Sequence, residues 1–507
     1  MRIKNVLQYL EQTAQRLPDK VAFSDGEGGA SLTFSELLDR ARRIGSCLCR
    51  AGLTGKRVAI LMDRHPAAVA AMLGAVYAGA VYVPLDAAMP KERMGAILES
   101  CRAAAIICDR QSHDAAAPYG LPLLLAEDMI SQGIDEADLS RIRSRQIDTE
   151  PMYIIFTSGS TGTPKGVVGC HRAVIDYGEA LMQTLSLDES AVLGCQSPLY
   201  FDAPLKELLA TLMLGATTYL IPKKLFSFPV LLMDYLNDNG VNTICWVSSA
   251  LSTVAALDAL EARPPLSLKT VVFGSERLPM GHYRAWRKTL PDATFYQLYG
   301  PTEATGMSCV WRADRELSEH ECIPIGAPMD NTGLLLIDDN GQEILPALGA
   351  ESAVGEMYLR GSCLTLGYDN NPEQTARAFV QNPTHSDYPE VVYRTGDLAY
   401  FNAQGELVFV GRRDGQIKRM GHRIEPGEIE ACAHRVEGVA LSACVVTEQT
   451  SEMVLFYTGE ADKKVVMTAL ADSLPRYYLP ARAIRLETMP AMPNGKIDRR
   501  ALSKEGS

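Results

Sequence analysis

The stretch that decides the fold is Tyr153-Ile-Ile-Phe156, followed directly by Thr157-Ser-Gly-Ser-Thr-Gly-Thr-Pro-Lys-Gly166. Four apolar residues in a row predict a short buried strand. The loop after the strand contains three glycines, which allow a backbone to approach a ligand closely. Its hydroxyl side chains and free N–H groups can surround phosphate oxygens, and Lys165 adds a positive charge. This part of the chain is therefore predicted to bind an anion.

Apolar runs of strand length alternate with helical patterns on both sides of this loop. The clearest runs are Arg57-Val-Ala-Ile-Leu-Met62, Ala105-Ile-Ile-Cys108 and Thr270-Val-Val-Phe273. Buried strands separated by amphipathic helices predict α/β layers with largely parallel sheets. After about Glu351 short alternating strands take over, such as Gly355-Glu-Met-Tyr-Leu-Arg360. The predicted fold class is α/β, with layered α/β subdomains and a β-rich subdomain in a large N-terminal domain, followed by a small α+β C-terminal domain.

Composition narrows the function. The chain has 507 residues, of which 47% are apolar and 22% charged, and its formal net charge is −12. An acidic chain of this kind is a poor candidate for coating nucleic acid or an anionic membrane. The uncharged run from Ala67 to Leu85 turns β-branched at Val81-Tyr-Val83, which predicts a buried helix and then a buried strand rather than a membrane span. The twelve cysteines form no Cys-x-x-Cys pair, which favours reduced thiols and a cytoplasmic location.

Further motifs accompany the anion-binding loop along nearly the whole chain. In order they are Leu32-Thr-Phe-Ser-Glu-Leu37, Tyr77-Ala-Gly-Ala-Val-Tyr-Val-Pro-Leu-Asp86, the loop itself, Phe201-Asp202, Tyr299-Gly-Pro-Thr-Glu303, Gly355-Glu-Met-Tyr-Leu-Arg-Gly361 with Gly367-Tyr368, Tyr393-Arg-Thr-Gly-Asp397, Gly411-Arg-Arg-Asp-Gly-Gln-Ile-Lys-Arg-Met-Gly-His-Arg-Ile-Glu425, Leu474-Pro475 and Pro493-Asn-Gly-Lys-Ile-Asp498. Together they resemble the adenylate-forming superfamily, which includes adenylation domains of nonribosomal peptide synthetases, acyl- and aryl-CoA ligases and firefly luciferase. The set is most similar to the amino-acid-activating members.

The resemblance implies two half-reactions that use ATP and Mg²⁺. A carboxylate first attacks the α-phosphorus of ATP to give an acyl-AMP and pyrophosphate, and a thiol then takes the acyl group while AMP leaves. Because the attacking group is already an anion, positive charge and hydrogen-bond donors must face the phosphorus. The resemblance also implies two domains, an ATP- and amino-acid-binding core over 1–413 and a mobile subdomain over 414–507 that carries the catalytic lysine, with Asp414 as the hinge.

The resemblance assigns roles to individual residues. Lys496, Thr302 and Glu303 are the implied catalytic residues: Lys496 bridges the substrate carboxylate and the nucleotide, Thr302 contacts the α-phosphate and Glu303 holds Mg²⁺. Asp397 is the implied ribose ligand, since an ionised carboxylate can accept from both hydroxyls, and Tyr299 would stack on adenine. The full nucleotide-binding set is Thr157, Ser158, Gly159, Ser160, Thr161, Gly162, Thr163, Lys165, Gly274, Ser275, Tyr299, Asp397 and Arg412.

A substrate pocket follows from the same comparison. Its implied residues are Asp202, Ala203, Lys206, Ser249, Val271, Phe273, Leu298, Gly306 and Met307, with Lys496. Asp202 would pair with the α-ammonium of an amino acid, although it could instead cap the helical run Leu205–Leu214. Lys206 could recognise an acidic side chain, or pair with Asp202 four residues earlier on one helix face. Phe273 should shorten the pocket and disfavour Phe or Trp, so the expected substrate is a small or an acidic amino acid.

The thiol acceptor is the remaining expectation. The chain stops eleven residues after Lys496 without a carrier motif, so we expect a stand-alone enzyme that serves the phosphopantetheine of a separate carrier protein. An acyl- or aryl-CoA ligase that uses free CoA is the first alternative. The second is a D-alanine–carrier-protein ligase, because stand-alone members of that kind have similar length. A non-catalytic scaffold is a third reading, which the presence of Lys165, Thr302, Glu303, Asp397 and Lys496 together opposes.

Overall fold

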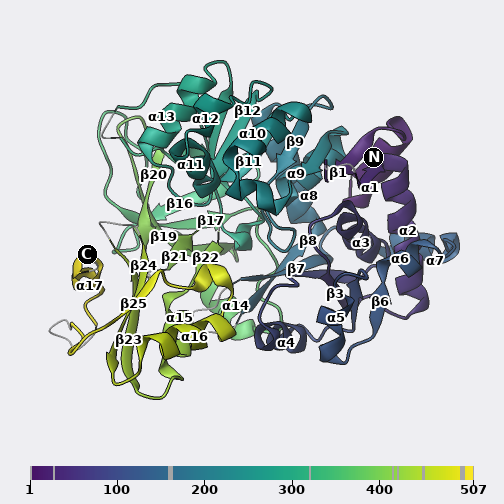
Figure 1. Cartoon of the computed structure of the whole chain (residues 1–507). Helices are drawn as coiled ribbons and strands as arrows, with labels where there is room; N and C mark the ends of the chain where they lie inside the picture. Colours follow the sequence, from purple (N-terminus) through teal and green to yellow (C-terminus); the bar gives the residue numbers. More distant parts are fainter. Residues whose placement is uncertain are drawn as a thin grey trace. The chain divides into compact units, whose positions relative to one another are not determined.

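The chain forms two compact units. A computed structural model describes residues 3–26, 29–157, 164–318, 321–413, 416–419, 422–447, 452–490 and 497–505 (Figure 1). The first unit consists of Met1–Ala87, Cys101–Ile155 and Gly166–Arg412, and the second of Ala88–Ser100, Phe156–Lys165 and Arg413–Ser507. The domain boundary between 413 and 414 stays a prediction.

A six-stranded sheet lies in the first part of the chain. Its strand order is β6 (Leu123–Leu125), β5 (Ala105–Cys108), β3 (Arg57–Leu61), β4 (Val81–Leu85), β7 (Pro151–Thr157) and β8 (Lys165–Cys170). The pairs β5–β6, β3–β5, β3–β4 and β4–β7 are parallel. The apolar runs that were predicted as strands in this region are strands, and the parallel pairing that they predicted is confirmed.

A nine-stranded sheet forms the second layer of the first unit. Its strand order is β15 (Ala327–Pro328), β14 (Cys309–Arg312), β13 (Thr294–Tyr299), β12 (Thr270–Gly274), β11 (Thr243–Val247), β9 (Val192–Cys195), β10 (Thr217–Leu220), β1 (Val21–Ser24) and β2 (Ser31–Thr33). Strands β13, β12, β11, β9, β10 and β1 run parallel in this order. Parallel strands end at the same edge of a sheet, which is where ligands bind in such folds.

Helices connect these strands and cover them. The helices of the first unit are α1 (Leu7–Arg16), α2 (Phe34–Arg50), α3 (Pro66–Tyr77), α5 (His113–Ala116), η1 (Ala117–Tyr119), α6 (Ala126–Ile130), α7 (Glu136–Arg145), α8 (His171–Leu185), α9 (Leu205–Leu214), η2 (Lys223–Ser227), α10 (Pro229–Asp238), α11 (Ser248–Ala256), α12 (Ala259–Ala262), α13 (Met280–Thr289), η3 (Thr302–Ala304) and α14 (Pro372–Ala378). Helices α10 to α13 gather around strands β11 and β12 (Figure 1). In the described residues no helix has both the length and the apolar character that crossing a membrane needs.

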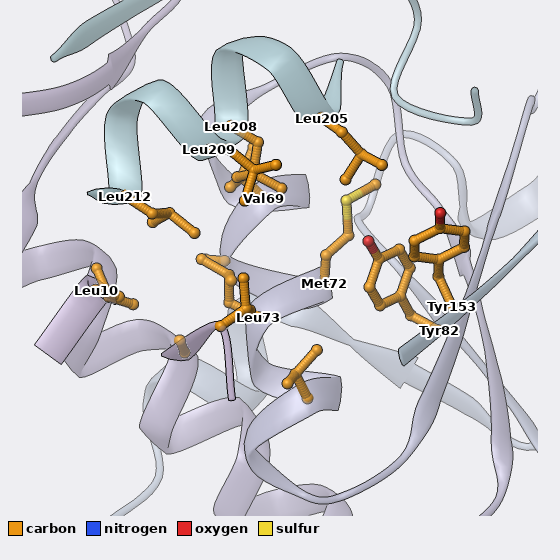
Figure 2. Packing of buried hydrophobic residues seen from close by; sticks show 14 of the residues in the cluster. Leu10, Val69, Met72, Leu73, Tyr82, Tyr153, Leu205, Leu208, Leu209 and Leu212 are labelled. Carbon is orange, nitrogen blue, oxygen red and sulfur yellow. The ribbon is translucent and has the colours of Figure 1, made fainter. Parts of the chain in front are cut away.

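The run from Ala67 to Leu85 forms helix α3 and strand β4, as predicted. Helix α3 is buried on nearly all sides, which explains its uncharged Ala- and Gly-rich sequence. Gly74 of α3 lies against Ile44 of α2 so closely that an added Cβ would come within 2.5 Å of it. Figure 2 shows Val69, Met72 and Leu73 of α3 in the same cluster as the leucines of α9. This cluster is the main core of the first unit.

A half-buried arginine connects the two parallel sheets. Arg64 follows β3, and its guanidinium donates to the backbone carbonyls of Gln196, after β9, and of Ile221, after β10. Burial lowers the pKa of Arg64 from its usual value. The carbonyls at the strand ends therefore have a charged donor instead of water.

The β-rich part predicted after Glu351 is a five-stranded antiparallel sheet. Its strands are β16 (Gly333–Ile337), β17 (Gly355–Arg360), β19 (Val391–Phe401) and β18 (Phe379–Gln381) in this order, with β20 (Leu407–Arg412) also paired to β19. In β19 and β20 the Cα atoms of Asp397 and Arg412 are directly opposite.

The second unit mixes helices and short sheets. Strands β23 (Val439–Val446), β24 (Met453–Gly459) and β25 (Arg482–Arg485) form one sheet and β21 (Ile417–Arg419) pairs with β22 (His422–Ile424). The helices are α4 (Lys91–Ser100), α15 (Pro426–His434), α16 (Lys463–Ser473), η4 (Arg476–Tyr478) and α17 (Arg499–Glu505). Within this unit, Arg93 of α4 forms a buried ion pair with Glu428 of α15 and lies over the ring of Tyr478.

Candidate active site

Several predicted site residues meet at the carboxyl edge of the nine-stranded sheet. Strands β9, β11, β12 and β13 run parallel and end at this edge. Gly274 at the end of β12 is opposite Leu298 of β13, and a Cβ on Gly274 would be 2.2 Å from the Leu298 carbonyl oxygen. Only a glycine lets the two backbones approach in this way.

Asp397 accepts two strong hydrogen bonds in the first unit. The Tyr299 hydroxyl donates to its Oδ2 atom at 2.5 Å, and the Arg412 guanidinium donates to Oδ1 at 2.6 Å. Asp397 is 1% exposed. Its N–H donates to the Thr395 hydroxyl at 2.9 Å, and Thr395 in turn donates to the Met357 carbonyl at 2.7 Å. The carboxylate is thus held in one orientation by strands β13, β19 and β20.

The protonation of Tyr299 fits this geometry. Burial and the neighbouring Asp397 carboxylate raise the pKa of Tyr299 well above its usual value, so its hydroxyl keeps the proton that it donates. A carboxylate oxygen has more than one acceptor direction. Asp397 can therefore accept from a further hydroxyl while it stays bound to Tyr299 and Arg412.

Glu303 lies in the one-turn helix η3 and is fully buried. The Tyr368 hydroxyl donates to its Oε1 atom at 2.7 Å. Its backbone carbonyl accepts from the Thr365 N–H and from the Thr365 hydroxyl, both at 3.0 Å. These contacts fix the segment that directly follows Tyr299, so Tyr299, Thr302 and Glu303 are positioned together.

Asp202 is half-buried in the segment before α9. Burial is the main cause that raises the pKa of Asp202, while a hydrogen bond with Thr302 and the charge of Lys206 act in the opposite direction. The N-cap position of α9 is Pro204. The alternative that Asp202 caps this helix is therefore wrong. Its backbone carbonyl accepts from the Leu205 N–H at 3.0 Å, which leaves the carboxylate for other contacts.

A small pocket lies beside Asp202 in the first unit. Its empty volume, open solvent included, is about 240 Å³, and it is lined by Ser197, Ala203, Lys206, Cys245, Trp246, Val247, Val272, Phe273, Gly274, Ser275, Leu298 and Met307. Of the predicted residues, Ala203, Lys206, Phe273, Gly274, Ser275, Leu298 and Met307 are among these lining residues. Most of the surface is apolar, and Lys206 brings a cation to it.

Three further predicted pocket residues also belong to the first unit, and their roles stay predictions. Ser249 is in α11, where its N–H donates to the Glu276 carboxylate at 3.2 Å. Val271 is fully buried in the core on β12, and at Gly306 an added Cβ would meet the Tyr177 ring. None of the three is among the lining residues of this pocket.

Trp246 is a pocket residue that the sequence did not reveal. It pairs with Phe273 across the parallel strands β11 and β12, so the two side chains reach the same level of the pocket. The signal was present in the apolar run Thr243–Val247, whose last residues mark the end of a buried strand. Placing Phe273 at the pocket would have placed Trp246 there through the strand register.

Several predicted residues lie outside the residues that the structure describes: Ser158, Gly159, Ser160, Thr161, Gly162, Thr163, the hinge Asp414 and Lys496. Thr157 ends β7 and Lys165 begins β8, so the two flank the loop. Both belong to the second compact unit. Their roles stay predictions.

The donor chemistry of the site is compatible with Mg²⁺. In the described part of the chain no group of three or more His, Cys, Asp or Glu side chains could hold a metal ion. Mg²⁺ needs no such group, because it binds through one or two carboxylates together with substrate phosphates and waters. Glu303 offers a buried, oriented carboxylate of this kind.

The family follows from comparison with known proteins. The AMP-binding enzyme family matches residues 10–369. The chain therefore belongs to the AMP-binding enzyme family, whose members form adenylates.

Curated relatives come from peptide synthetases. One component of mycosubtilin synthase from Bacillus subtilis is 32% identical over 516 residues, which cover 99% of this chain and 19% of the relative. Tyrocidine synthase 2 of Brevibacillus parabrevis is 30% identical over 507 residues, covering 99% of this chain and 14% of the relative. The chain thus spans less than a fifth of the length of these relatives.

Solved structures share the fold. Holo-PA1221, described as a nonribosomal peptide synthetase protein with adenylation and PCP domains, has a TM-score of 0.84 and 26% identity, covering 98% of this chain and 84% of that chain. An o-succinylbenzoate CoA synthetase from Bacillus subtilis has a TM-score of 0.82 at 20% identity. The match covers 99% of this chain and 98% of that chain. The latter likeness concerns the fold alone. The predicted resemblance to adenylation domains of nonribosomal peptide synthetases is confirmed.

Proposed function

We propose that this chain activates an amino acid with ATP and then passes the aminoacyl group to the phosphopantetheine thiol of a carrier protein. The observation that carries the proposal is Asp202, a carboxylate hydrogen-bonded with Thr302 beside a small, largely apolar pocket. An α-ammonium group next to Asp202 would favour its ionised form and so offset the burial that raises its pKa. Acids without an amino group would bring no positive charge to that carboxylate.

In the first half-reaction the substrate carboxylate oxygen bonds to the α-phosphorus of ATP, and the bond to pyrophosphate breaks. Asp397 would orient the ribose, with Tyr299 and Arg412 holding its carboxylate in place. Glu303 would hold Mg²⁺, which supplies positive charge to the phosphates. Thr302, next in the chain to Glu303, would donate to the α-phosphate, and Lys496 would bridge the two anionic reactants.

In the second half-reaction the carrier thiol bonds to the acyl carbon, and AMP leaves with the electron pair of the mixed anhydride. A structure of a protein with adenylation and PCP domains resembles this chain over 98% of its length. This likeness supports a carrier protein as the acceptor. We expect the carrier to be a separate chain, in a cytoplasmic setting.

ATP–pyrophosphate exchange with a panel of carboxylic acids tests this function. The panel contains the common L-amino acids, D-alanine, and fatty and aryl acids without an amino group. We expect exchange with an amino acid only, and a loss of about 100-fold or more in Asp202→Asn. Asp258→Asn is the matched control, because Asp258 is exposed and has φ 53, which Asn tolerates well.

Two results would overturn the proposal. Exchange with acids that lack an amino group, followed by acyl transfer to free CoA, would identify the CoA-ligase alternative. Absence of exchange with every acid would indicate a scaffold. Thioester formation is then compared with a phosphopantetheinylated carrier protein and with free CoA as acceptor, and faster transfer to CoA would exclude the carrier.

A further inference from the structure

Lys206 is a nearly buried cation at the pocket. It is the second residue of α9, it is 5% exposed, and it lines the pocket together with Trp246 and Phe273. Its ammonium group donates to the Ala203 carbonyl at 2.8 Å. An ammonium carries three donors. Among the residues that the structure describes, the bond to Ala203 is the one hydrogen bond of the ammonium group, so two of its donors remain for a ligand.

The nearby carboxylates do not pair with this cation. The charge of Lys206 acts to lower the pKa of both Asp202 and Glu207. No ion pair joins Lys206 to either of them in the described part of the chain, so the predicted alternative of an Asp202–Lys206 pair is not formed. Glu207 lines a different cavity, together with Met72 and Tyr82. Lys206 alone of the three projects its charge among the aromatic and aliphatic walls of the pocket.

A desolvated cation among apolar walls is unfavourable until an anion joins it. Trp246, Phe273 and Leu298 are at most 2% exposed, so they shield the site from water. Shielding strengthens the attraction between opposite charges. A substrate carboxylate would therefore bind most favourably where it contacts the Lys206 ammonium.

We propose that the amino acid activated by this chain is a dicarboxylic one, aspartate or glutamate, whose side-chain carboxylate binds the Lys206 ammonium. The inference rests on the proposed function, because it assigns the α-ammonium to Asp202 and the reacting carboxylate to ATP. Two charged contacts of opposite sign then define both ends of the substrate. Neutral isosteres would leave Lys206 without its anion.

The first test needs no variant. ATP–pyrophosphate exchange of the unmodified chain is compared for aspartate and asparagine, for glutamate and glutamine, and for alanine, serine and threonine. We expect kcat/KM for one of the two acids to exceed that of its own amide by about 100-fold or more, because a buried charge discriminates strongly against an uncharged analogue. An amide or a small neutral amino acid as the best substrate would overturn the inference while leaving amino-acid activation intact.

Variants then locate the recognition. Lys206→Met keeps the length of the side chain and removes its charge, so the preference for the acid over its amide should fall by about 100-fold. Glu207→Gln is the neighbouring control on the same helix and should keep the ranking of the original chain. Lys223→Met removes an exposed lysine and should do the same. An unchanged acid preference in Lys206→Met would show that another residue reads the side chain.

A binding measurement separates recognition from turnover. Aspartyl- or glutamyl-sulfamoyl-adenosine and the corresponding amide analogues are titrated against the original chain and Lys206→Met, with circular dichroism to verify folding. We expect tighter binding of the acidic analogue to the original chain only. Equal affinities for both analogues would overturn the inference. Failure of every amino acid in the exchange assay would instead contradict the proposed function.

Discussion

Two buried carboxylates of the first unit differ in the hydrogen bonds that they accept. Asp397 accepts from Tyr299 and Arg412, whereas both carboxylate oxygens of Glu207 lack a hydrogen-bond partner among the described residues. Glu207 is 1% exposed, and burial raises its pKa to about 7. Removal of the Asp397 charge should therefore lower the free energy of unfolding, whereas removal of the Glu207 charge should raise it at alkaline pH.

Asp397→Asn should destabilise the first unit. The substitution removes the carboxylate charge that pairs with the Arg412 guanidinium, which is 5% exposed. Breaking one side of a buried ion pair lowers the free energy of unfolding by about 3 kcal/mol. Urea denaturation measures this change, with Asp258→Asn as control. A loss below about 1 kcal/mol would contradict the role of this pair, and adenylation should also fall if Asp397 binds ribose.

Glu207→Gln should stabilise the chain at alkaline pH. The folded state binds the Glu207 proton up to a pKa of about 7, against an ordinary value of 4.5. The contribution of Glu207 to the free energy of unfolding is fully present below pH 4.5, where its carboxyl group is protonated in the folded and the unfolded state. It is lost as the pH rises through 7, because the buried carboxyl group must then ionise. Relative to the original chain, the variant should gain about 2 kcal/mol between pH 5 and pH 8. Urea unfolding of both proteins at pH 5 and pH 8 measures this gain. If the difference in free energy of unfolding between variant and original chain were the same at both pH values, Glu207 would stay ionised throughout.

Motifs located some site residues and missed others. Asp202 could be placed from the sequence because a short motif precedes the helical run of α9. Trp246 could not, since its position depends on the register of β11 against β12. Ser249 lies in the first turn of α11, two residues after the lining residue Val247, and its place in the pocket stays a prediction.

At the scale of elements, α2 and α3 show that the sequence predicts individual helices and strands but not how they pack against each other. The uncharged run Ala67–Leu85 predicted a helix and a strand, since helix and strand patterns are local. The close approach of Gly45 and Gly74 where α2 packs on α3 depends on residues that are distant in sequence. The strand order, with β9 between β11 and β10, is non-local for the same reason.

Gly74→Val should separate α2 from α3. Its side chain would meet Ile44, whose Cγ2 atom is 2.5 Å from the position of an added Cβ. Overpacking of this kind lowers the free energy of unfolding by about 1–3 kcal/mol. Gly281→Ala in α13 is the control, because nothing lies within 4 Å of its added Cβ. Thermal unfolding should show a lower Tm for Gly74→Val alone; an unchanged Tm would refute the close contact.

At the scale of the whole molecule, the chain builds two units from discontinuous segments. The second unit includes Ala88–Ser100 with Arg413–Ser507. The buried pair between Arg93 and Glu428 joins segments more than three hundred residues apart. Sequence patterns predicted the α/β, β-rich and α+β parts, but the assignment of α4 to the second unit depends on contacts that no local pattern contains.

Asp414→Pro tests the predicted hinge. Proline fixes φ, so a rotation at this position should be restricted. We expect adenylation, measured by pyrophosphate exchange, to be retained better than thioester formation on a carrier protein. Asp414→Ala removes the same carboxylate but keeps φ free, and it is therefore the control. Equal loss of both activities in the proline variant would count against a hinge at this residue.

The charge of Arg64 determines how the contact between the two parallel sheets of the first unit depends on pH. A guanidinium keeps its charge across the physiological pH range, and here it holds carbonyls that follow β9 and β10. These two hydrogen bonds between the sheets therefore persist when the pH changes within that range. A neutral side chain at this position would remove the charged donor that joins the end of β3 to the ends of β9 and β10.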